Sequence, residues 1–174
     1  MKKICFALLA VILALFGCGS DDSDSSSSEA GRPSVGLEVE PEELDTGDRV
    51  MVRISVESEG DNLIELKLRY PRQFSYVQNS AQLFLDETSL PVAPGLDLQA
   101  AHSDERYLVF YFNARLLEPG GGAGEITLEL TANDAAEEVE FAVDADVAVG
   151  ENFDPEQPQF TAQDSAFVSV LPED

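Results

Sequence analysis

The chain has 174 residues, of which 34 are Asp or Glu and 10 are Lys or Arg, and its formal net charge is −24. This charge excludes an ordinary nucleic-acid-binding protein, because few basic side chains are available to neutralise phosphates. It also argues against electrostatic adhesion to anionic lipid headgroups. The length allows one domain, or two small ones.

Residues 1–17 have the pattern of a secretory signal peptide. A short basic start is followed by a largely apolar run of thirteen residues from Ile4 to Phe16. As a helix, this run would be about 20 Å long, which is too short for a hydrocarbon core of ~30 Å. We therefore expect the segment to be removed from the mature protein, together with Cys5.

The signal peptide ends in Leu15-Phe16-Gly17-Cys18, which resembles a bacterial lipobox. Phe16 departs from the pattern, because a small or β-branched residue is commoner at that position. The resemblance implies that Cys18 becomes the first residue and carries two or three acyl chains, enough for stable membrane attachment. Gly19, in place of Asp, resembles the address of an outer-membrane lipoprotein. Ordinary secretion without a lipid is the alternative.

Residues 18–33 are rich in Ser and Asp and contain almost nothing that can bury apolar surface. We expect them to form a disordered, acidic tether of up to about 55 Å. Removal of Lys2 and Lys3 with the signal peptide leaves 34 acidic and 8 basic side chains, a net charge of −26. With Cys18 acylated, no thiol remains for a disulfide, so the fold must hold through its hydrophobic core.

From residue 34 to 174 apolar and polar side chains alternate with period two, which is typical of half-buried antiparallel strands. The pattern is clear over 50–56, 66–70, 126–130 and 139–143, and 106–112 is apolar on both faces, as in a central strand. Further candidate strands are 35–40, 81–86, 96–101 and 165–171, and turn residues fall at 46–48, 59–62, 91–95 and 119–122. About nine short strands predict an all-β fold, a two-sheet antiparallel sandwich.

The order of these features resembles the cohesin family. Residues 44–52 look like the opening cohesin hairpin, with a Thr-Gly-Asp turn before an alternating strand. Residues 66–71 resemble the cohesin strand that ends in a Tyr-x-Pro corner, although here Tyr70 and Pro71 are adjacent. Residues 106–112 and 123–131 lie where cohesins have two core strands. This resemblance implies a jelly-roll sandwich that acts as a scaffold without chemistry.

A second resemblance is to the conserved-repeat, immunoglobulin-like domains of bacterial surface proteins. Residues 71–81 look like their P-x-G-x-x-Y-V-P-G-S-A segment, with Gln73 and Asn79 in place of glycines and Gln78 in place of a proline. It implies an adhesion or scaffolding sandwich of immunoglobulin-like topology. The two topologies remain open at this point.

The sequence offers little for catalysis. His102 is the one histidine, and its neighbours Ser103 and Asp104 cannot form a triad with it, because a triad joins distant segments. One histidine and no mature thiol nearly exclude zinc. Glycoside hydrolysis uses a pair of carboxylates, but in a chain with 34 acids the presence of such pairs is uninformative. Trp, which often binds the sugar in glycosidases, is absent. We therefore expect no enzymatic activity.

Two sets of residues are candidates for binding. Tyr70, Phe74 and Tyr76 would form an aromatic platform if they are exposed, whereas packing in the core or at a corner is the structural alternative. Asp144 and Asp146 should point to one side of a strand and, with Asp154, supply hard oxygen ligands for calcium. A solvated acidic face is the alternative for these three.

These observations predict a lipid-anchored protein of the cell outer membrane that faces the periplasm or the cell surface. Its sandwich would bind a protein or a polysaccharide, and the lipid on Cys18 would attach it to the membrane. We expect no nucleic-acid partner and no cofactor, with calcium as the one possible exception. Two alternatives stay open. One is a purely structural subunit of an envelope complex, which a large apolar patch would favour. The other is a carboxylate-dependent hydrolase.

Overall fold

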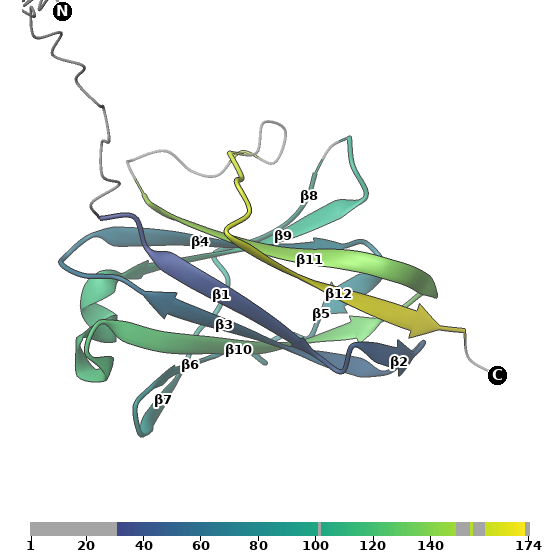
Figure 1. Ribbon diagram of the computed structural model, residues 1–174, viewed down its shortest axis with the longest axis horizontal. Coiled ribbons are helices and arrows are strands. Elements are labelled where there is room, and N and C mark those ends of the chain that lie inside the picture. The colour runs from purple at the N-terminus through teal and green to yellow at the C-terminus, as the bar shows by residue number, and fades with distance from the viewer. Residues whose placement is uncertain (1–30, 101, 149–153, 155–158, 173–174) are drawn as a thin grey trace, which may run out of the picture.

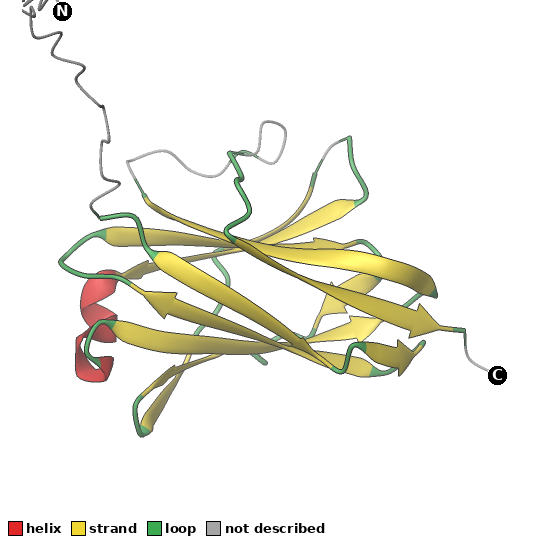
Figure 2. Cartoon of the chain, viewed as in Figure 1, coloured by secondary structure: helices red, strands yellow, loops and turns green. Residues whose placement is uncertain are grey.

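The computed structural model describes residues 31–100, 102–148, 154 and 159–172. Within them, two six-stranded sheets pack face to face (Figure 1), and strands dominate the secondary structure (Figure 2). The predicted all-β, two-sheet sandwich is therefore confirmed. The one helix among the described residues is a short 3-10 helix, η1 (Ala114–Gly120), at one end of the sandwich.

The chain crosses between the two sheets several times. Sheet A has the order β1 (Ser34–Glu40), β3 (Arg49–Glu57), β10 (Ala123–Ala132), β6 (Gln82–Leu85) and β7 (Thr88–Pro91), and β5 (Phe74–Tyr76) also pairs with β10. Sheet B has the order β2 (Glu43–Asp45), β12 (Asp164–Leu171), β11 (Ala136–Val147), β4 (Leu63–Pro71), β9 (Glu105–Asn113) and β8 (Leu96–Gln99). All neighbouring strands are antiparallel except β2 and β12, which are parallel.

The nine strands expected from the sequence are all present, and three short strands, β2, β5 and β7, were not predicted. Each has three or four residues, too few for a period-two pattern to stand out. The predicted strand over 81–86 is shorter than expected, because the chain reverses after Leu85. Asp86 there has a positive φ of 50°, and β7 then pairs back onto β6.

The core lies between the two sheets, because every second side chain of each long strand points inward. The inward side chains of β3 and β4 are fully buried: Val50, Val52, Ile54 and Val56 on β3, and Ile64, Leu66 and Leu68 on β4. Burying each such side chain contributes roughly 1.5–3 kcal/mol relative to leaving it exposed. On one side the sandwich is closed between β1 and β12, where the Leu37 N–H donates to the Asp164 carboxylate at 2.8 Å.

A second, smaller apolar cluster lies on the outer face of sheet B. Its buried members are Ala100, Tyr107 and Val109, and Phe160 packs against them. Phe160 belongs to residues 159–163, a segment that we call the strap, which lies over the outer face of sheet B before β12 begins. The strap converts part of an outward sheet face into an interior.

Candidate functional site

Lys67 and Asp144 are the charged side chains that the described part of the chain buries most completely, with 1% and 0% exposed. They lie opposite each other on the paired strands β4 and β11. Lys67 Nζ is 2.9 Å from an Asp144 carboxylate oxygen. Because a buried charge is costly without a partner, this pair is the natural centre of the site.

The pair is buried although it points away from the main core. Alternation places Leu66 and Leu68 in the core and Lys67 on the opposite, outward face. The strap covers that face, and Phe160 holds it there. The Phe160 ring makes an edge-to-face contact with Tyr107, with centroids 5.7 Å apart, and the Arg69 guanidinium lies 5.1 Å from the Phe160 ring centroid.

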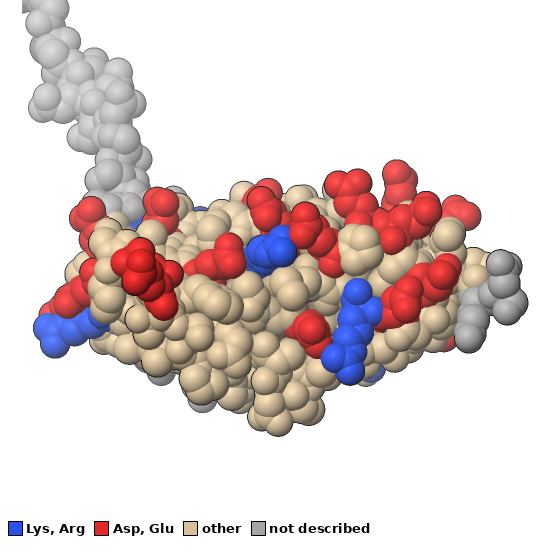
Figure 3. All heavy atoms as spheres, turned by 90° about the horizontal axis from the view of Figure 1, so that it is seen from below, with Lys and Arg blue, Asp and Glu red and all other residues tan. Residues whose placement is uncertain are grey.

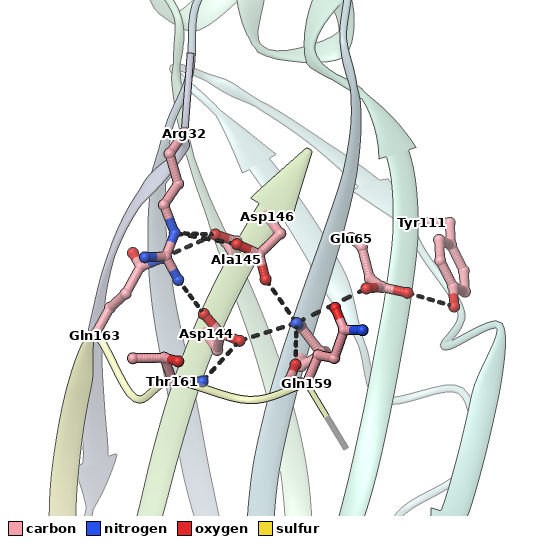
Figure 4. Close-up of polar contacts among 10 residues, drawn as sticks. Arg32, Glu65, Tyr111, Asp144, Ala145, Asp146, Gln159, Thr161 and Gln163 are labelled. Atoms are coloured by element: carbon pink, nitrogen blue, oxygen red, sulfur yellow. Dashed lines mark hydrogen bonds and ion pairs between the residues drawn. The ribbon is translucent and has the colours of Figure 1, made fainter. Parts of the chain in front are cut away.

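The Lys67 ammonium has an acceptor for each of its three N–H groups (Figure 4). It donates to Asp146 Oδ2 at 2.7 Å and to the Gln159 carbonyl at 2.7 Å, and the Asp144 oxygen lies at 2.9 Å. Burial by itself would lower the pKa of Lys67, but the bonds and charges of Asp146 and Asp144 outweigh burial, so that its pKa is raised. The site therefore holds a charged ammonium.

Arg32 ties the N-terminal end of the domain to the same cluster. Its guanidinium contacts Asp144 at 2.8 Å and Asp146 at 3.1 Å, and it donates to the Ala145 carbonyl at 3.3 Å. Figure 4 shows the Arg32 side chain directed toward Asp144, Ala145 and Asp146. Arg32 was predicted to belong to the tether, and the structure places it against β11 instead.

The strap completes the cluster through its backbone and one side chain. The Thr161 N–H donates to Asp144 at 3.2 Å, and the Gln163 side-chain amide donates to the Ala145 carbonyl at 2.8 Å. Glu65, 3.8 Å from Lys67, accepts a 2.8 Å hydrogen bond from the Tyr111 hydroxyl. Because the lysine has no N–H left for a substrate, the arrangement acts as a clamp that joins the N-terminal segment, two strands and the strap.

The three candidate aromatic residues are buried, so they do not form an exposed platform. Tyr70, Phe74 and Tyr76 have exposed fractions of 1%, 0% and 9%. Phe74 packs edge to face on Phe141 with ring centroids 5.0 Å apart. The Tyr70 hydroxyl donates to Asp97 at 3.2 Å, and burial, with that carboxylate, raises the pKa of Tyr70. These residues form the corner packing that was the structural alternative.

The calcium candidates are only partly brought together. Asp144 and Asp146 share one side of β11, but Lys67 and Arg32 already pair with both. Asp154 is exposed, and the other donors expected at 151–152 lie outside the described residues. Within the described ranges no group of three or more His, Cys, Asp or Glu side chains is placed to hold a metal ion. Calcium stays a prediction.

His102 is exposed in the loop before β9, beside a shallow pocket. The Ser103 hydroxyl is 3.4 Å from Glu105, and Asp104 pairs with Arg72 at 3.0 Å. Ser103 and Asp104 thus contact other residues, in agreement with the reasoning that three adjacent residues do not make a triad.

The signal peptide, the lipobox with Cys18 and most of the predicted tether lie outside the described residues. In the ranges that are described, no helix is long and apolar enough to cross a bilayer.

The fold and the site together define an all-β sandwich with an ion clamp on the outer face of one sheet. No family model and no curated protein matches the chain. Among solved structures, the chain is similar to SpaA, the major pilin of Corynebacterium diphtheriae, with 13% identity and a TM-score of 0.53 over 79% of this chain and 36% of the pilin.

Two further structures are similar at lower scores. The T6 backbone pilin of Streptococcus pyogenes has 10% identity and a TM-score of 0.49 over 79% of this chain and 36% of the pilin. The non-cellulosomal cohesin from Archaeoglobus fulgidus has 10% identity and a TM-score of 0.42 over 80% of this chain and 91% of the cohesin. At such identities the likeness to SpaA shows the fold alone.

Proposed function

We propose that this chain is a lipid-anchored protein of the bacterial cell envelope whose β-sandwich is a non-catalytic interaction module. The clamp is the observation that supports a non-catalytic role. The polar atoms of Lys67 and Asp144 contact each other and neighbouring segments of the chain. A pilin and cohesins share the sandwich architecture, which supports a place at the cell surface and a protein partner. A polysaccharide partner is the second form of this proposal.

Cys18 carries the membrane part of the proposal. A fusion of residues 1–33 to a reporter should enter the detergent-rich phase after phase separation, because two or three acyl chains hold it there. Cys18→Ser should leave the reporter in the aqueous phase. A wild-type fusion that stays in the aqueous phase would overturn the anchor and leave the proposed role of the sandwich untouched.

The structure of SpaA was reported to point to a modular pilus assembly with stabilizing isopeptide bonds, and Lys67 beside Asp144 raises the same question here. We infer that Lys67 keeps its free amine. An amide nitrogen would carry one N–H, whereas three acceptors surround Nζ within 2.9 Å. Amide formation also needs a neutral amine, which the two carboxylates disfavour.

Intact-mass spectrometry of the folded domain tests this inference. The expected mass is that of the sequence, and Lys67→Arg should change it only by the difference between the two side chains. A wild-type mass that is low by one water, with the deficit abolished in Lys67→Arg, would show a covalent bond at Lys67.

The rival of a carboxylate-dependent hydrolase requires two carboxyl groups that face each other across a cleft, roughly 5–10 Å apart. Asp144 and Asp146 are carboxylates that the fold brings together, and cations of the chain pair with them. We therefore favour the interaction module over the hydrolase.

A further inference from the structure

The strands at one edge of sheet A carry no charged side chain. Residues 73–85 and 88–96 contain no Asp, Glu, Lys or Arg, although these residues make up 25% of the chain. They form β5, β6, β7 and the connection to β8. In the view from below, acidic side chains gather along one long side and one end of the molecule, whereas a broad area along the opposite side is largely uncharged (Figure 3).

A shallow groove of about 450 Å³ lies beside this edge, where β6, β10 and the end of η1 meet. Phe84, Pro119, Gly120, Ala123 and Gly124 line it. Phe84 is 41% exposed on the outer face of β6. The groove therefore offers apolar surface that the fold itself does not cover.

Close packing at Gly124 fixes the shape of the groove. A Cβ atom there would lie 2.9 Å from a Leu117 methyl group and 3.2 Å from the Phe84 carbonyl oxygen. The absence of a side chain lets η1, β6 and β10 approach one another, and Phe84 remains at the surface beside them. The groove is thus formed by rigid elements, which favours binding because little ordering is needed.

The charge of the groove is negative. Asp86 and Glu125 line it together with the apolar residues, and no Lys or Arg does. Arg53 is near enough to Glu125 for their charges to interact. The Arg53 guanidinium, however, forms an ion pair with the Glu40 carboxylate, at 2.5 Å. An occupant therefore meets apolar atoms flanked by two carboxylates.

We propose that this groove binds a segment of a partner protein that presents an apolar side chain next to a Lys or Arg. The inference rests on the proposed function as an interaction module and names the surface and the chemistry of its partner. The apolar side chain packs against Phe84 and Pro119, and the basic group faces Asp86 and Glu125. In a chain of net charge −24, this combination also attracts the partner over a distance.

A random peptide library displayed on phage, selected on residues 31–174, tests the proposal. Enriched peptides should combine an apolar residue with an adjacent Lys or Arg. Phe84→Ser should weaken a selected peptide about tenfold or more, as the loss of a central apolar contact does. Phe167→Ser is the matched control, since Phe167 is also an exposed phenylalanine, at 56%, but lies on β12 of the other sheet.

Two further variants separate groove binding from a change in folding. Gly120→Val should block the groove without strain, because a Cβ there would meet only the Asp86 nitrogen, at 4.0 Å. Asp86→Asn with Glu125→Gln should weaken the peptide and reduce the salt dependence of its affinity. Unchanged melting temperatures would show that all variants fold.

Several results would overturn the proposal: no enriched peptide, enriched peptides without a basic residue, or affinity that Phe84→Ser and Gly120→Val leave unchanged. Neutral glycans that bind on an array and are lost in Phe84→Ser would assign the groove to a sugar instead. Peptides that bind but are insensitive to groove variants would leave the interaction module standing and remove only this surface.

Discussion

At the scale of the residue, Lys67 shows how a polar side chain can specify structure without being the source of stability. Removing a lysine and an aspartate from water costs several kcal/mol per ion, and their attraction repays this only when every hydrogen bond is made. The cluster around Lys67 meets that condition. Its role is therefore to fix the strap and Arg32 against β4 and β11.

Lys67→Met tests the clamp through stability. The substitution leaves Asp144 buried with Arg32 as its remaining cation, so the free energy of unfolding should fall by roughly 3–5 kcal/mol. Urea denaturation measures the loss. Arg72→Met is the control, because its partner Asp104 is 70% exposed and such surface pairs are worth about 1 kcal/mol or less. Equal losses in both variants would contradict the clamp.

Alkaline pH should destabilise the protein through Tyr107 and Lys67. Burial, together with the neighbouring Glu105, raises the pKa of Tyr107 to about 12 from the ordinary 10.0. A raised pKa means that the folded state holds the proton more tightly. The stabilisation is complete below pH 10.0 and is lost as the pH rises to about 12. The raised pKa of Lys67 acts in the same direction above 10.5.

Urea denaturation at increasing pH measures this loss, and Tyr107→Phe should make the decline shallower. A spectrophotometric titration should show one late-titrating tyrosine fewer in the variant. The interpretation fails if the wild-type free energy of unfolding stays level across this range.

At the scale of the element, the strap is the part of the fold that period-two patterns do not reveal. Alternation places Lys67 on the outward face of β4, and it is the one lysine of the sequence beyond residue 17. Its cover comes from residues 159–163, about ninety positions further along the chain. That separation is what a local pattern cannot show.

The long strands were predictable, because five or more residues of alternation distinguish a strand from a loop. The position of Asp144 and Asp146 on one side of β11 was also predictable, whereas their ion pairs with Lys67 and Arg32 were not. The sequence left the exposure of Tyr70 and Phe74 open for a related reason. Their exposure depends on which sheet packs over them, and short motifs near a turn do not determine this.

Phe160→Ala tests the strap as a unit. Loss of the ring contact should expose Tyr107 and lower its pKa toward the ordinary 10.0. Amide exchange at Thr161 should accelerate, since its N–H bond to Asp144 closes the strap. The global cost should be small, about 1–2 kcal/mol, because Phe160 is only half-buried. Phe167→Ala on β12 should leave exchange at Thr161 unchanged, and equal acceleration in both would refute the strap.

At the scale of the whole molecule, acidic side chains outnumber basic ones by 34 to 10, and several arginines of the described ranges are paired with acids. Arg49 pairs with Glu129, Arg53 with Glu40, and Arg115 with Asp61. The proximity of Arg115 lowers the pKa of Asp61 through a hydrogen bond that outweighs desolvation. The surplus of acids keeps the surface soluble and repels other copies, so that the uncharged edge with Phe84 is the favourable place for contact.

Self-repulsion should make the melting temperature depend on salt. At about 0.01 M salt the Debye length is roughly 30 Å, so acids repel across the domain, and at about 0.1 M it is roughly 10 Å. Calorimetry should therefore show a melting temperature that rises with NaCl over this range. A melting temperature that does not rise would mean that the surface acids are spaced too widely to strain the fold.

The same experiment decides the calcium prediction when CaCl2 and MgCl2 are compared at equal ionic strength. Screening alone raises the melting temperature equally for both ions, whereas a site of six to eight oxygen ligands prefers calcium. Because Lys67 and Arg32 occupy Asp144 and Asp146, a calcium ion would have to displace them or use Asp154 with other donors. A calcium-specific rise that is lost in Asp154→Asn would establish such a site. Equal melting temperatures in the two salts would contradict a calcium site and leave Lys67 and Arg32 as the partners of Asp144 and Asp146.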